Sequence, residues 1–131
     1  ILMDLTGLAS SGSGDIIGKA GTASSNIGTT TVALNGTILG GKLTCVETPA
    51  GGDPDIDLWY ADESTGAEDA AITSLSNQIQ MLNSGDLAAG SVLGIPVPPA
   101  AGKFMYLVTG AATNADYTAG KILIEFFGYD A

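Results

Sequence analysis

Arginine and histidine are absent from the 131 residues, and the only cations are four lysines, Lys19, Lys42, Lys103 and Lys121. Against them stand 14 acidic residues, which give a formal net charge of −10. Nucleic-acid binding requires several phosphates to be neutralised together, and four scattered lysines on an acidic chain would repel a polyanion. An anionic membrane surface is disfavoured for the same reason, and no apolar run approaches the ~20 residues of a spanning helix. We therefore expect a soluble protein that binds neither nucleic acid nor membrane.

Cysteine is almost absent too, because Cys45 is the only one and no internal disulfide can form. It shares a strand face with Leu43 in "KLTCVET", which predicts a small buried side chain. A cysteine or serine nucleophile needs a base such as imidazole, which the chain lacks. Neither a GxSxG elbow nor a Walker-type glycine loop occurs. We therefore predict a protein that is not an enzyme and has no cofactor.

The composition favours one folded domain spanning residues 1–131, with 45% apolar and 14% charged residues. Turn signals recur along the chain, and the segments between them are β-branched or aromatic, which is typical of an all-β sandwich. Strands are expected at residues 2–5, 15–18, 29–34, 37–48, 55–62, 78–82, 91–97, 103–110 and 121–130.

Glycine and proline define the expected turns. Asn35-Gly36 predicts a hairpin turn, and Gly40-Gly41 predicts a bulge or kink inside a long strand, with positive φ at one of the two. Pro96, Pro98 and Pro99 lack the N–H that a central strand needs, so "IPVPPAAG" is expected at a sheet edge or in a crossing loop.

Only residues 66–83 compete as a helix, because their apolar side chains follow a helical stripe. Thr65 and Glu68 have the spacing of a capping box. We expect a short helix near residues 67–75, the only one in the chain, and a strand near residues 78–83.

Three aspartates, Asp53, Asp55 and Asp57, precede the single tryptophan, Trp59, in "GGDPDIDLWYADES". An EF-hand loop starting at Asp53 fails, because its sixth position would be Leu58 rather than glycine. Strand alternation places Asp55, Asp57 and Trp59 on one face, which we interpret as the solvent face. A catalytic carboxyl pair would need burial to raise one pKa, so this position disfavours it. The three aspartates remain weak metal candidates. The alternative to a plain solvent-facing strand is that they contact calcium or a sugar.

Both alternate faces are apolar in "FMYLVTG" and "KILIEFFGYD". A sandwich strand needs only one apolar face, so the second must be covered by a loop, a helix or another subunit. We expect other copies of the chain to cover it, with closed symmetry. In the last strand the residues predicted at this interface are Leu123, Glu125, Phe127 and Tyr129.

Three segments, "IDLWYADESTGAEDAAI", "DLAAGSVLGIPVPPAAGKFMYLV" and "YTAGKILIEFFGYD", resemble small acidic structural proteins of tailed bacteriophages, including capsid cement or decoration proteins. The resemblance covers residues 30–131; residues 1–30 match least and are a candidate N-terminal arm. It implies a β-sandwich of jelly-roll or immunoglobulin-like type that assembles as trimers on an icosahedral shell.

The resemblance and the composition together predict a non-enzymatic virion structural protein, a capsid cement protein on the capsid exterior whose partner is the major capsid protein. The alternative is a carbohydrate- or calcium-binding β-sandwich adhesin module. Trp59 distinguishes the two hypotheses: an exposed indole among acids favours ligand binding, whereas an indole packed under a loop favours a structural role.

Overall fold

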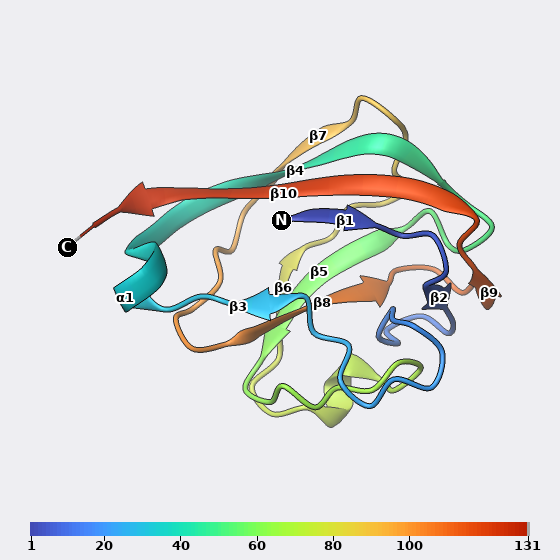
Figure 1. Ribbon diagram of the computed structural model, residues 1–131, viewed down its shortest axis with the longest axis horizontal. Helices are drawn as coiled ribbons and strands as arrows, with labels where there is room; N and C mark the ends of the chain where they lie inside the picture. The colour runs from blue at the N-terminus through green and yellow to red at the C-terminus, as the bar shows by residue number, and fades with distance from the viewer. Residues whose placement is uncertain (131) are drawn as a thin grey trace.

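The computed structural model describes residues 1–130, which form two four-stranded antiparallel sheets packed face to face (Figure 1). The strands of the first, here called the β4–β10 sheet, are in spatial order β1 (Leu2–Asp4), β10 (Ala119–Tyr129), β4 (Thr37–Ala50) and β7 (Val92–Ile95). The strands of the second, the β5–β8 sheet, are β3 (Gly28–Thr29), β8 (Phe104–Thr109), β5 (Ile56–Ala61) and β6 (Ile79–Leu82). The predicted all-β sandwich is confirmed.

The remaining elements are short. β2 (Ala9–Ser10) pairs with β9 (Ala115–Asp116) at one end of the sandwich, α1 (Val32–Asn35) is one helical turn, and η1 (Ile72–Ser74) is a 3-10 turn. None of the helices in residues 1–130 has the length and apolar character needed to cross a membrane.

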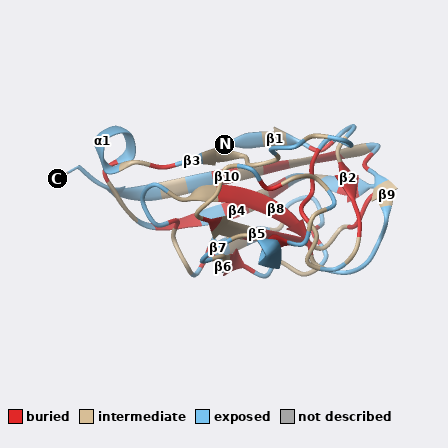
Figure 2. Cartoon of the chain, turned by 90° about the horizontal axis from the view of Figure 1, so that it is seen from below, coloured by how far each residue is buried: buried red, intermediate tan, exposed pale blue. Residues whose placement is uncertain are grey.

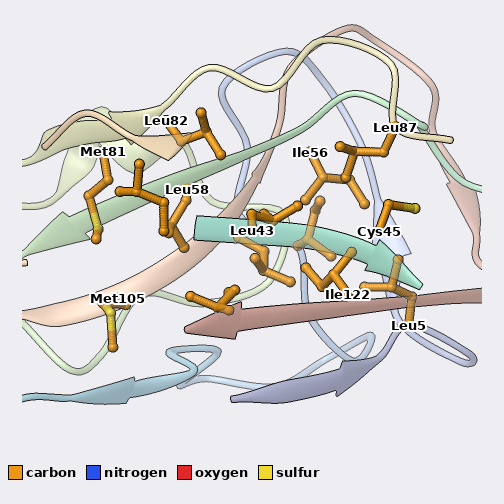
Figure 3. Packing of buried hydrophobic residues seen from close by; sticks show 14 of the residues in the cluster. Leu5, Leu43, Cys45, Ile56, Leu58, Met81, Leu82, Leu87, Met105 and Ile122 are labelled. Atoms are coloured by element: carbon orange, nitrogen blue, oxygen red, sulfur yellow. The ribbon is translucent and has the colours of Figure 1, made fainter. Parts of the chain in front are cut away.

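The core lies between the two sheets, because the long strands β4, β5, β8 and β10 turn alternate side chains inward (Figure 3). Cys45 is a buried free cysteine in this cluster, as its strand position predicted. Burying one aliphatic side chain of this core stabilises the fold by roughly 1.5–3 kcal/mol. The innermost members from the two sheets are Leu43, Cys45, Ile122, Ile124, Ile56, Leu58, Met105 and Leu107.

Residues 1–30 lie against the sandwich. They provide β1, β2 and β3, and Leu5, Ile16 and Ile17 among them are buried. The backbone N–H of Leu5 donates to the carbonyl of Gly120, and that of Ile17 donates to the carbonyl of Leu107, each at 2.9 Å. The segment is therefore joined to both sheets.

Residues 29–34, predicted as a strand, instead lead into α1. The Thr31 hydroxyl accepts a hydrogen bond from the Leu34 N–H at 3.3 Å, and the Asn35 side chain accepts one from the Thr31 N–H at 2.9 Å. These local bonds outweigh the β preference of the threonines and the valine. Gly36, at φ 65°, then ends the turn directly before β4, so Asn35-Gly36 is not a hairpin turn.

Residues 67–75 do not form the predicted helix, and only the 3-10 turn η1 is present there. Asp69 has a φ of 66°, which a helix cannot accept, and its N–H donates to the carbonyl of Ile16. Glu68 accepts from the Gly21 N–H at 3.3 Å rather than completing a capping box. Tertiary contacts with residues 14–22 thus replace the local helix.

The Gly40-Gly41 pair lies beside an irregularity in β4, but neither glycine has a positive φ. Phe127 pairs with Gly40 and Gly128 pairs with Ile38, so the extra residue of the bulge is Leu39. The predicted bulge is present, but at Leu39, one position before the two glycines. The predicted positive φ at Gly40 or Gly41 is wrong. The glycines are needed for the close approach of β4 to β10.

The prolines lie where their missing N–H groups predict. β7 is the outermost strand of the β4–β10 sheet, and it ends at Ile95, directly before Pro96. Pro98 and Pro99 follow in the connection that returns to β8.

Candidate functional site

Both β8 and β10 carry apolar side chains on two faces, and the chain itself covers the second face of only one of them. On β8, Tyr106 and Val108 point away from the main core, yet both are buried. Residues from two distant segments, including Ile16 and Ile72, pack over them as a second core. In Figure 2 β8 is accordingly red. Loops, rather than a second subunit, therefore cover the side of the β5–β8 sheet that points away from the main core.

The outer face of the β4–β10 sheet has no such cover in residues 1–130. Ile122 and Ile124 point inward, so their neighbours Leu123, Glu125 and Phe127 point outward. Register then places Leu2 beside Leu123 and extends the face through Thr44 to Val92. Leu2 is 65% exposed, Val92 59% and Phe127 63%. We call this surface the outer face; its apolar members are Leu2, Val46, Val92, Leu123, Phe127 and Tyr129.

Charge is nearly balanced on the outer face, unlike the rest of the chain. Lys42 pairs with Glu125 at 3.2 Å, and Lys121 pairs with Glu47 at 2.8 Å. The hydrogen bond and charge of Glu47 raise the pKa of Lys121. With Asp4 opposite Lys121, the face holds three carboxylates and two lysines, a formal charge of −1 out of the total of −10. Such exposed pairs contribute little stability, but they remove the net charge that would repel an acidic partner.

The four residues predicted at an interface lie together on β10. Leu123 is half-buried, whereas Glu125, Phe127 and Tyr129 are exposed. In Figure 2 the C-terminal end of β10 is pale blue, as is α1. Leu2 and Val92 also belong to this face and were not predicted from the sequence. The alternation of apolar and polar residues around Leu2 and Val92 can be read from the sequence. The pairing of β1 and β7 with the long strands cannot.

Asp53 is a structural hub rather than a solvent-exposed acid. It is fully buried, and its carboxylate accepts hydrogen bonds from the backbone N–H groups of Asp55 and Thr113, both at 2.9 Å. Its own N–H donates to the Ser10 hydroxyl, and its carbonyl accepts from the Tyr117 hydroxyl at 2.6 Å. Asp53 thus joins the start of β5 to segments at both ends of the chain.

Asp57 also contradicts the expected solvent position. It shares a face with Trp59 as alternation predicted, but that face is covered and Asp57 is only 7% exposed. Its carboxylate accepts from the Gln80 side-chain amide at 2.9 Å and from the Ser84 N–H at 3.0 Å. The acid is therefore paired with polar donors from β6 and the following loop.

Asp55 lies between the other two and is half-buried. One of its carboxylate oxygens is buried without a hydrogen-bond partner in residues 1–130, and its carboxylate packs against Gly110. Burial first, and then the charges of Asp57, Asp53 and Asp86, raise the pKa of Asp55. Burial likewise raises the pKa of Asp57 against the opposing hydrogen bonds from Ser84 and Gln80.

The three aspartates do not converge as metal ligands. Within residues 1–130 no group of three or more histidine, cysteine, aspartate or glutamate side chains is placed to hold a metal ion. The carboxylates of Asp53 and Asp57 accept hydrogen bonds from donors within the protein. The observed contacts of these two acids are those of a structural network.

Trp59 is half-buried and packs against the second core, as Leu75 and Phe104 also do. Its indole nitrogen is buried and has no hydrogen-bond partner in the described chain. An indole packed against the core resembles the packed arrangement that was expected for a structural role.

No family model, no curated protein and no solved structure matches this chain.

Proposed function

We propose that this chain is a non-enzymatic structural protein of a bacteriophage particle, a cement protein that attaches to the capsid exterior through the outer face of the β4–β10 sheet. The observation that supports the proposal most is the contrast between the two sheets. The chain covers the second apolar face of β8 with its own loops and leaves that of β10 exposed. An exposed apolar sheet face is a frequent feature of protein–protein interfaces.

Charge favours a protein surface as the occupant of this face. The outer face carries a formal charge of −1, and its two lysines are already paired with glutamates. Of the remaining carboxylates, those of Asp53 and Asp57 are buried within the protein, and none of the others is a member of the outer face. A shell that repeats the same contact many times can retain such a protein even when each contact is weak.

The adhesin alternative is less well supported. It needs Trp59 as an open stacking surface, and Trp59 packs against the second core. It also needs carboxylates that are free to bind sugar or calcium, and those of Asp53 and Asp57 accept hydrogen bonds within the protein. The trimer and the major capsid protein as partner, which the phage resemblance implies, stay predictions.

Co-sedimentation tests the proposal. The purified chain is mixed with empty capsids of the phage that encodes it, and the capsids are pelleted. We expect saturable binding with a fixed number of copies per capsid. Absence of the chain from the pellet across a range of salt concentrations would refute capsid attachment.

A further inference from the structure

A hollow of about 360 Å³ lies between β1, β8 and the loop that follows Ile17. Both ends of this loop are tied to the edge of β8, because the Ile17 N–H donates to the carbonyl of Leu107 and the Ile27 N–H to that of Met105. Residues 18–26 arch away between these two points, in the light-blue trace between β2 and β3 of Figure 1. The hollow is thus framed by backbone bonds to a rigid strand.

The floor of the hollow is aliphatic and its rim is polar. The floor is formed by Met3, Leu8, Ile17, Ile27 and Leu107. Lys19, Thr22, Ser25 and Asn26 are among the rim residues. Its volume lies in the range of small-molecule sites, which combine apolar walls with a few convergent polar groups.

Two polar groups near the hollow lack partners, and only the second of them, Lys19, is exposed. The Ser25 hydroxyl oxygen is buried and has no hydrogen-bond partner in residues 1–130. It lies against Gly18, where any side chain would collide with it. Lys19 is the one lysine that forms no ion pair among the described residues, since Lys42, Lys103 and Lys121 each pair with an acid. The Ser25 oxygen is closed off from the hollow, whereas the free ammonium of Lys19 invites an anion.

We propose that this hollow binds a small aliphatic carboxylate, with the hydrocarbon chain on the aliphatic floor and the carboxylate at the Lys19 ammonium. The inference goes beyond the proposed capsid role and does not depend on it. Charge supports the class of ligand, because Lys19 offers the only unneutralised side-chain cation on a chain with a net charge of −10. A cationic ligand would meet this ammonium at the rim.

Octanoate is the probe, and octylamine, which has the same chain length and the opposite charge, is the matched control. Two-dimensional amide NMR of the full chain follows both titrations. We expect octanoate to bind with a Kd on the order of 1 mM, because about ten heavy atoms contribute a few tenths of a kcal/mol each. Shifts should concentrate at residues 17–27 and at Leu107. Equal binding of octylamine, or no saturable octanoate shifts up to about 20 mM, would overturn the proposal.

Two substitutions locate the site. Lys19→Gln should weaken octanoate binding by roughly fivefold to tenfold, whereas Lys42→Gln, which removes a lysine of the outer face, should leave it unchanged. Equal effects of Lys19→Gln and Lys42→Gln would show that octanoate binds by net charge alone and would also overturn the proposal.

Discussion

The ring of Phe127 lies over Gly40, its pairing partner on β4, so closely that a Cβ atom at Gly40 would be 2.8 Å from the Cζ atom of the ring. Gly41 is as crowded, but there a Cβ would meet the backbone carbonyl oxygen of Glu125 at 2.6 Å and the Phe126 ring at 2.7 Å. The two glycines therefore allow β4 and β10 to approach for different reasons.

The two positions should respond differently to alanine. Gly40→Ala should cost less than about 1 kcal/mol, because the exposed Phe127 ring can rotate aside. Gly41→Ala should cost roughly 1–3 kcal/mol, because backbone and a packed ring must move. Urea unfolding of both variants measures the difference, and equal costs at the two positions would contradict this account of the strand pair.

Asp53 and Asp57 should also differ when each is changed to asparagine. Both oxygens of Asp53 accept from backbone N–H groups, and an asparagine can accept only one of these bonds, so Asp53→Asn should destabilise by about 1–3 kcal/mol. One donor to Asp57 is the Gln80 amide, which can turn to present its oxygen. Asp57→Asn should therefore stay within about 1 kcal/mol of the parent at neutral pH. A larger loss at Asp57 than at Asp53 would reverse the assignment of the structural hub.

Stability should depend on pH through Asp57. Burial raises the pKa of this carboxyl in the folded protein above its unfolded value, so the folded state binds the proton more readily. Protonation then stabilises the fold fully below the unfolded pKa, and this stabilisation is lost as pH rises through the raised value. Relative to the parent, Asp57→Asn should be most favourable at pH 7 and should lose this advantage as the pH falls toward about 4. Thermal melts of both proteins across this range provide the test, because the other acids are common to both. A constant difference in melting temperature would argue against a raised pKa.

Sequence alternation predicted the long strands well, because the inward residues of β4, β5, β8 and β10 follow a period of two. It assigned Asp57 to solvent because its cover comes from residues distant in the chain, and no local pattern shows such cover. Asp53 was missed as a hub for the same reason, since Thr113 and Tyr117 lie some 60 residues away. The part of the outer face on β10 was predicted from its two apolar faces. Leu2 and Val92 belong to the outer face only because β1 and β7 pair with the long strands, which the sequence does not show.

Capsid binding by paired aspartate variants tests the outer face most directly. Phe127→Asp places a charge on the outer face, and Ile79→Asp places the same charge at an exposed residue of β6 in the other sheet. Both isolated variants should remain folded by circular dichroism, since both side chains are exposed. In co-sedimentation with empty capsids we predict that Ile79→Asp binds like the parent and that Phe127→Asp stays in the supernatant, because docking would bury an unpaired charge. Capsid binding by Phe127→Asp at the parent level would contradict attachment through the outer face.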